Sequence, residues 1–173
     1  MIGCSIQFSD GHQANIQVDG SITDIIVEEE MQVEQISVFL ENKSGRLSEV
    51  TAILTESNVN IRALALADTS DFGVLRLIVD DTETAQATLK NHGFTVGKTQ
   101  VVAVEVPDRP GGLHEILMML HEAKINVEYM YAFVRTSGDN AVMIFRIEQE
   151  EQAVALLASK GVQVIDGQRL YTL

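Results

Sequence analysis

The sequence is short of cysteine, of tryptophan and of positive charge. Cys4 is its one cysteine, which excludes an intrachain disulfide and a thiolate metal cluster. The formal net charge of -13 at pH 7 disfavours binding to a nucleic-acid backbone or an anionic membrane surface. No apolar run approaches the roughly 20 residues that span a bilayer, and the N-terminus lacks the pattern of a signal peptide. We therefore expect a cytoplasmic protein with no nucleic-acid and no membrane partner.

Hydrophobic and charged residues occur in ordinary proportions, 46% and 21%, which are typical of a globular protein with a buried core. The first 34 residues carry seven acids and no Lys or Arg. Polar and apolar residues alternate on both sides of Asp10-Gly11, and this pattern predicts a β-hairpin. We therefore expect residues 1–34 to form an N-terminal extension.

A repeated stretch organises the rest of the chain. Residues 38–60 read VFLENKSGRLSEVTAILTESNVN, and residues 104–126, 66 positions later, read VEVPDRPGGLHEILMMLHEAKIN. Gly45 of the first copy aligns with Gly111 of the second. In both copies a strand pattern precedes the glycine turn, and apolar residues at helical spacing follow it. One structural unit is therefore used twice.

Each copy is predicted to contain six elements in the order strand, helix, strand, strand, helix, strand. In the first copy the patterns predict strands at 35–41, 59–67, 74–79 and 94–96, with helices through 47–54 and 82–91. In the second copy they predict strands at 101–106, 125–134, 141–147 and 162–165, helices through 113–120 and 150–159, and a final edge strand at 169–173. This order is that of the ferredoxin-like fold, so the predicted fold class is α+β.

A ferredoxin-like unit leaves one face of its sheet open and its second strand at an edge. The neighbouring copy is the expected partner for both surfaces. We predict two βαββαβ units packed side by side, forming one eight-stranded antiparallel sheet with the helices on one face. The expected domains are an extension at 1–34, a first unit at 35–98 and a second unit at 99–173.

Several functions of this fold are excluded by the sequence. The third strands, 74–79 and 141–146, carry no pair of aromatic side chains for stacking RNA bases. The first loops hold no cysteine for the Cys-x-x-Cys site of metal-transfer proteins. His114 and His121 lie seven positions apart, whereas metal ligands on a helix are usually three or four apart. No catalytic arrangement of Ser, His and Asp is recognisable, so we expect no enzyme activity, no metal and no cofactor.

The two turns resemble the ACT domain family. The second copy carries Asp-Arg-Pro-Gly-Gly-Leu at 108–113, followed by Asn126, and the first carries Asn-Lys-Ser-Gly-Arg-Leu at 42–47, followed by Asn60. The resemblance covers residues 35–165. It implies sensors of small ligands, most often amino acids, that regulate amino-acid metabolism and commonly pair side by side.

The chemistry of the turns suits an amino acid. Glycine allows a sharp turn, and bare N–H groups at a helix N-terminus attract a carboxylate. The same residue types are also ordinary turn and cap residues, which leaves a purely structural role open. The candidate ligand-binding residues are Asn42, Gly45, Arg46, Leu47, Asn60, Asp108, Gly111, Gly112, Leu113, His114 and Asn126.

Side-by-side pairing predicts two unequal pockets. In the first, residues 42–47 face residues 128–131 of the second unit, whose side chains are bulky. In the second, residues 108–113 face residues 62–65, whose side chains are mostly small. The first turn also departs from the family pattern at Ser44, where proline is usual. We therefore expect the second pocket to be the better ligand site.

Two functions stay open at this stage. One is a freestanding sensor that binds an amino acid. The other is a regulatory subunit of an amino-acid biosynthetic enzyme, similar to the small subunit of acetolactate synthase, which acts mainly through protein contact. The family resemblance also implies a homodimer. A structural module with degenerate pockets is a third possibility.

Overall fold

The computed structural model describes residues 3–7, 13–17, 33–68, 71–137 and 140–172. Near the N-terminus, β1 (Gly3–Gln7) pairs antiparallel with β2 (Gln13–Gln17). The turn at Asp10-Gly11 lies outside the described residues. The division of the chain at residues 34 and 98 stays a proposal.

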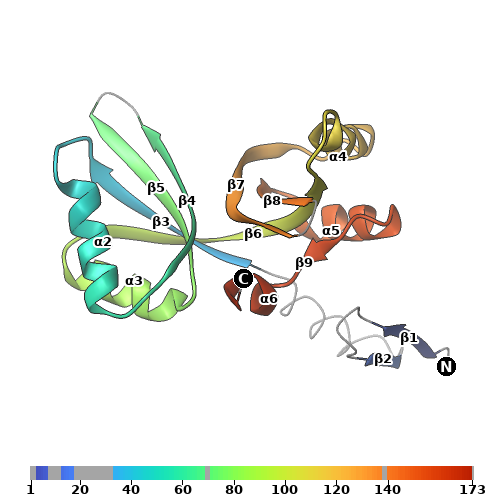
Figure 1. The fold of residues 1–173 in the computed structure, drawn as a ribbon, viewed down its shortest axis with the longest axis horizontal. Coiled ribbons are helices and arrows are strands. Elements are labelled where there is room, and N and C mark those ends of the chain that lie inside the picture. Colours follow the sequence, from blue (N-terminus) through green and yellow to red (C-terminus); the bar gives the residue numbers. More distant parts are fainter. Residues whose placement is uncertain (1–2, 8–12, 18–32, 69–70, 138–139, 173) are drawn as a thin grey trace.

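The remaining described chain alternates strands and helices in the predicted order (Figure 1). In the first unit these are β3 (Val33–Glu41), α2 (Arg46–Glu56), β4 (Ile61–Asp68), β5 (Phe72–Val79) and α3 (Thr82–Asn91). The long strand β6 (Thr95–Pro107) follows. In the second unit these are α4 (Gly112–Glu122), β7 (Val127–Ser137), β8 (Asn140–Ile147), α5 (Glu150–Ser159), β9 (Val164–Ile165) and α6 (Gly167–Thr172).

The ends of α3 illustrate how local sequence fixes these elements. The Asp81 carboxylate accepts a hydrogen bond from the Thr84 N–H at 2.9 Å, which satisfies one of the free donors of the first turn. The Thr84 hydroxyl also donates to this carboxylate, at 2.6 Å, and the two bonds from Thr84 hold the pKa of Asp81 below its usual value. At the other end, Gly93 takes a left-handed φ of 84° and ends the helix. Both ends confirm the sequence interpretation.

One seven-stranded antiparallel sheet runs through both units, in the order β4-β5-β3-β6-β8-β7, with β9 also paired to β6. The prediction of eight strands was wrong because β6 is shared. Its first half pairs with β3, from Thr95 opposite Phe39 to Val101 opposite Val33, and its second half pairs with β8. Residues 97–100, expected to connect two strands, continue the ladder because pairing with β3 satisfies their backbone groups.

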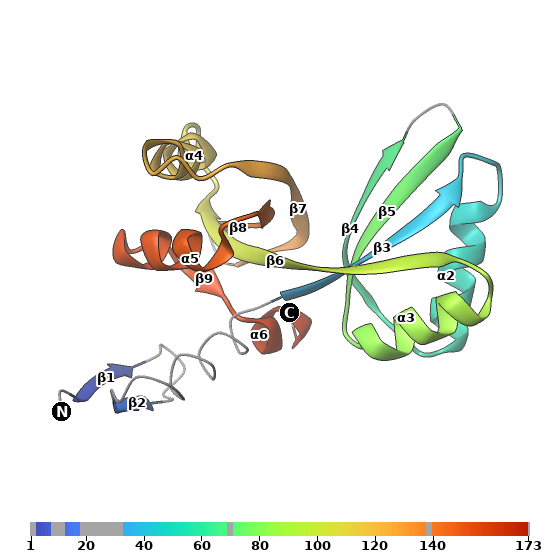
Figure 2. The same ribbon diagram turned by 180° about the vertical axis from the view of Figure 1, so that it is seen from behind.

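The two helix pairs lie at opposite ends of the molecule, with the strands between them, as Figures 1 and 2 show. Helices α2 and α3 close one apolar core against the first unit's strands, and α4 and α5 close a second core against the other strands. Side chains at alternate positions of each strand enter these cores, because successive residues of a strand point to opposite faces of the sheet. The four helices thus cover the same side of the shared sheet.

The opposite sides of the two units meet in a third apolar core. Ala63 and Ile78 from the first unit pack there with Phe133 and Ile144 from the second. The sheet curls enough to bring its two edge strands, β4 and β7, close together. Because the shared sheet curls, each unit covers the sheet face that the helices of its neighbour leave open.

The C-terminal segment completes this third core as a helix. Residues 169–173 were predicted to be an edge strand, and that prediction was wrong for the described part, which lies in α6. The Asp166 carboxylate accepts from the Arg169 N–H at 2.7 Å and starts the helix. Leu170 is fully buried, and the Tyr171 hydroxyl accepts from the Glu34 N–H at 2.9 Å. Burial of Leu170 favours the helical arrangement.

The longest described helices, α2 and α4, have 11 residues each. A helix needs about 20 apolar residues to cross a bilayer. In the part of the chain that the structure describes, none is long and apolar enough to do so.

Candidate ligand-binding turns

The two predicted turns start their helices with nearly the same backbone geometry. Gly45 precedes α2 with φ 92° and ψ -22°, and Gly111 precedes α4 with φ 91° and ψ -15°. Both conformations are left-handed, which glycine adopts without strain. Neither helix has a side-chain cap bond at this position. The repeat therefore preserves a specific backbone shape.

This shape leaves helix donors without a protein acceptor. Glu49 and Glu115 donate their N–H groups to the carbonyls of Gly45 and Gly111, at 2.9 and 3.0 Å. Within the described residues, no acceptor is found for the preceding N–H groups, which belong to Leu47, Ser48, Leu113 and His114. Such groups, together with the helix dipole, attract an anion. Each turn therefore offers a place for a carboxylate.

Both turns are closed by the same two backbone bonds, but the second leaves no room for a side chain. Arg109 donates its N–H to the Pro107 carbonyl at 2.8 Å, and Gly112 donates to the Arg109 carbonyl at 3.0 Å; the equivalent bonds of the first turn, from Lys43 and Arg46, are 2.8 and 3.3 Å long. A Cβ atom on Gly112 would lie 2.1 Å from the Pro107 carbonyl oxygen. Gly112 is therefore required for close packing of the turn rather than for an unusual φ angle.

The first turn carries Arg46 at the position equivalent to Gly112. The Arg46 side chain pairs with Glu49 and places its guanidinium over the Phe94 ring, 4.4 Å from the ring centroid. The Asn42 N–H donates to the Asp71 carbonyl at 2.9 Å, which ties the turn to the start of β5. Arg46 thus packs against Phe94, a residue of the first unit's own apolar core.

A guanidinium reaches the equivalent glutamate in both units, from different sequence positions. Arg109 donates two bonds to the Glu115 carboxylate, at 2.9 and 2.8 Å, and its guanidinium lies about 4.0 Å from where a Cβ on Gly111 would stand. In the first unit, Arg46 donates one bond to the Glu49 carboxylate. Each pair neutralises a carboxylate in the first helical turn that would otherwise repel an anionic ligand.

The two asparagines stand where β4 and β7 begin. The Asn60 N–H donates to the Asp80 carboxylate at 2.8 Å, and its carbonyl accepts from the Asp80 N–H at 3.2 Å. The side chains of Asn60 and Asn126 are exposed. Among the described residues, no hydrogen bond joins either side chain to its turn. Both amides are therefore available to a ligand.

The predicted cross-pairing of turns and strands is not formed within one chain. The turn between β3 and α2 lies apart from β7 in both views, and the turn between β6 and α4 lies apart from β4 (Figures 1 and 2). Tyr129 and Tyr131 of β7 instead contact Gln35 of β3. Sequence reasoning missed Gln35, although a polar residue among apolar strand positions was a visible signal.

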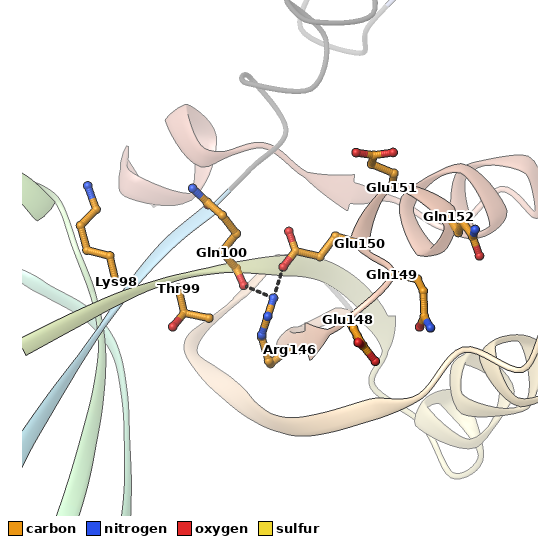
Figure 3. A pocket seen from close by; sticks show the side chains of 9 residues that line it. All are labelled: Lys98, Thr99, Gln100, Arg146, Glu148, Gln149, Glu150, Glu151 and Gln152. Carbon is orange, nitrogen blue, oxygen red and sulfur yellow. Dashed lines mark hydrogen bonds and ion pairs between the residues drawn. The ribbon is translucent and has the colours of Figure 1, made fainter.

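A cavity of about 640 Å³ lies away from both turns, where β6 passes between the units beside the start of α5 (Figure 3). Arg146 donates to the Gln100 carbonyl at 3.1 Å and pairs with Glu150. Burial raises the pKa of Glu150, against the opposing effect of Arg146. The lining residues are Lys98, Thr99, Gln100, Arg146, Glu148, Gln149, Glu150, Glu151 and Gln152.

Both cations that line this cavity already have carboxylate partners. Lys98 pairs with Glu34 at 2.7 Å and with Glu83 at 2.6 Å. These partners raise the pKa of Lys98. Elsewhere in the described chain, no group of three or more His, Cys, Asp or Glu side chains is arranged to hold a metal ion. The two turns are the better candidates for a ligand.

Comparison with known proteins defines the class to which this fold and these turns belong. The family of ACT domain pairs matches residues 31–173. The chain therefore belongs to the ACT domain pair family, whose members are regulatory domains. No curated protein matches the chain.

Solved structures agree with this assignment. Protein BT0572 from Bacteroides thetaiotaomicron is 38% identical, with a TM-score of 0.79, over 84% of this chain and 99% of that one. The regulatory subunits of aspartate kinase from Thermus thermophilus and Thermus flavus both have a TM-score of 0.54. They are 16% and 15% identical, covering 73% and 74% of this chain and 91% and 92% of theirs. At that identity they show a shared fold alone.

Proposed function

We propose that this ACT domain pair is a sensor that binds a free amino acid at its glycine turns and regulates amino-acid metabolism. The observation that carries the proposal is the turn at Gly111, where a left-handed glycine leaves the Leu113 and His114 N–H groups without a protein acceptor. Two adjacent donors at a helix N-terminus suit a carboxylate. The single cysteine suits a reducing compartment, so we place the protein in the cytoplasm.

The second turn suits a zwitterion better than the first. Asp108 is exposed beside Gly111 and provides a carboxylate for the ligand ammonium. The equivalent position in the first unit is Asn42, which carries no charge. Binding should therefore be stronger at the second turn.

A second copy of the chain completes this proposal. In the family, the ligand lies between the first loop of one domain and the second strand of its partner. Within one chain β4 and β7 lie apart from the turns (Figures 1 and 2). We therefore propose a homodimer in which a strand from the partner covers each occupied turn, so that ligand and dimer stabilise each other.

A second candidate function is that of a regulatory subunit. The fold is shared with proteins described as regulatory subunits of aspartate kinase. In this alternative, the chain acts on an amino-acid biosynthetic enzyme mainly through protein contact. Co-purification with an enzyme, together with no amino-acid binding, would favour it.

Thermal unfolding in the presence of each of the twenty amino acids tests the sensor proposal. A ligand that binds only the folded protein raises the unfolding midpoint. We expect at least one amino acid to do so and to increase the sedimentation coefficient by forming the dimer. Absence of a shift with all twenty would contradict the proposal.

Matched substitutions assign the site. Gly111→Asp and Gly45→Asp add the same carboxylate at the same φ angle, 91° and 92°, so their effects on backbone strain should be similar. Isothermal titration should show that Gly111→Asp weakens binding about tenfold or more, because the new charge repels the ligand carboxylate. Gly45→Asp should have the smaller effect. Equal losses would refute the inequality of the two turns.

A further inference from the structure

A buried glutamine lies at the contact between the two units. Gln35 has no exposed surface, and both polar atoms of its amide are hydrogen-bonded. The Gln35 Nε2 donates to the Ser37 hydroxyl at 3.1 Å and to the Tyr129 hydroxyl at 2.9 Å. Its Oε1 accepts from the Tyr131 hydroxyl at 3.0 Å. Two of the three bonds therefore cross from β3 of the first unit to β7 of the second.

The two tyrosines are themselves held in place. The Arg76 guanidinium, from β5, stacks on the Tyr129 ring at 3.9 Å from its centroid. Tyr131 packs against the third core, and burial raises the pKa of its hydroxyl, which therefore stays a neutral donor. Residues of β3, β5 and β7 thus meet at this contact between the units. We call Gln35, Tyr129 and Tyr131 the latch.

The latch occurs only once, although the unit is repeated. The equivalent of Gln35 in the second unit is Val101, and the equivalents of Tyr129 and Tyr131 in the first unit are Ala63 and Ala65. Val101 and Ala63 are buried apolar residues of the third core. The latch is therefore a specific departure from the repeat and is not a consequence of it.

We propose that the latch fixes the angle between the two ACT units, and thereby the relative placement of their two turns. A buried amide is costly unless all its hydrogen bonds are made, and an apolar contact tolerates rotation that a hydrogen bond does not. From Gln35, β3 leads into the turn at Gly45, and β7 starts directly after Asn126. A change in the angle between the units would therefore change the placement of one turn relative to the other.

Replacing the latch by apolar groups separates its effect on geometry from its effect on stability. The triple variant Gln35→Leu, Tyr129→Phe, Tyr131→Phe removes every polar group of the latch and keeps similar shapes. Removal of both partners of a hydrogen bond is close to neutral for stability, whereas Gln35→Leu alone leaves two half-buried hydroxyls without their partner. The triple variant should therefore unfold at about the midpoint of the parent, and the single variant should unfold earlier.

Spin labels then report the angle without any ligand. In a Cys4→Ser background, Glu56→Cys and Glu122→Cys place labels at the equivalent last residues of α2 and α4. Pulsed electron–electron double resonance measures the distance between the two labels. In the parent it should give one narrow distance distribution. In the triple variant the distribution should broaden or split, because the shared strand β6 and the apolar third core still join the units but tolerate rotation that the hydrogen bonds of the latch do not.

Ser37→Ala is the matched control, because it removes the one bond of Gln35 that stays within β3. Its distance distribution should stay narrow. A triple variant that is folded, as judged by circular dichroism, and whose distribution is as narrow as that of the parent would overturn the proposal. No amino acid is needed for this test, so its outcome is independent of whether the turns bind one.

Discussion

The two glycine turns share a backbone and differ at four of their six residues, 42–47 against 108–113. Gly45 and Gly111 agree within 1° in φ. The next position holds Arg46 in one turn and Gly112 in the other, and the guanidinium that neutralises the first-turn glutamate comes from Arg46 in one and Arg109 in the other. Two features are therefore common to both turns: a left-handed glycine before the helix, and an arginine that neutralises the glutamate of the first helical turn.

The two units also differ in how they end. The first unit ends in the long strand β6, whereas the second ends in β9, of two residues, and then in α6. The shared strand serves the first unit as its last strand and the second unit as its first. In the second unit, Leu170 of α6 packs into the third core.

The largest expected effect concerns α6. Leu170→Ala removes a fully buried side chain from the third core, and such truncations cost about 2–5 kcal/mol. Urea unfolding followed by circular dichroism measures the loss. Leu66→Ala in β4 is the control, because Leu66 is 46% exposed and should cost far less. Equal losses would show that α6 contributes little to the third core.

Next in size is the closed turn of the second unit. Gly112→Ala places a methyl group against the Pro107 carbonyl oxygen, and relief of that overlap should cost about 1–3 kcal/mol of folding free energy. Gly97→Ala is the matched control, since no atom lies within 4 Å of the added carbon. If both variants unfold at the same urea concentration, the turn is less rigid than its geometry indicates.

The second helices of the two units differ in their caps. Asp81 caps α3, whereas the equivalent Gln149 makes no cap bond at the start of α5. Asp81→Ala should cost about 1 kcal/mol at pH 7, and Gln149→Ala should cost little. Unfolding free energies from urea titrations measure both losses.

The pH dependence of this cap has a defined sign. Hydrogen bonds to Thr84 lower the pKa of folded Asp81 below its ordinary value of 3.8. Its contribution is therefore complete above that value and is lost as the pH falls through the folded pKa. The difference between wild type and Asp81→Ala should shrink only in that acidic range. A difference that shrank near neutral pH would contradict this assignment.

The smallest effect is expected at the ion pairs of the turns. Arg109 and Glu115 are about half exposed, at 54% and 48%, so Arg109→Ala should cost no more than about 1 kcal/mol and less at high salt. Arg46→Ala should cost more, because Arg46 also packs on Phe94. Unfolding at low and high sodium chloride distinguishes the ion-pair contribution, which salt weakens, from the packing of Arg46 on Phe94.

The local features were readable from the sequence. The apolar periodicity predicted the order of the elements, and Asp81 and Gly93 marked the ends of α3. The glycine turns were recognisable because a left-handed residue before a helix strongly favours glycine. The requirement for glycine at position 112 was not readable, because it arises from close contact with the Pro107 carbonyl and not from the φ angle of Gly112 itself.

The errors arose where distant segments decide the outcome. Residues 97–100 look like a connection in isolation, and only pairing with β3 makes them part of one strand. Residues 169–173 alternate like a strand, yet burial of Leu170 under both units favours α6. The contacts of Tyr129 and Tyr131 with Gln35 were not predicted, for the same reason.

The sequence by itself determined the repeated unit, the α+β class and the backbone of both turns, because periodicity and glycine act over a few neighbouring residues. The tertiary structure decided that one strand serves two units, that the chain ends in a helix, and that Gln35 binds two tyrosines about 95 positions away. Those outcomes depend on which surfaces meet when the sheet curls, and the free energy of such contacts is absent from any local pattern.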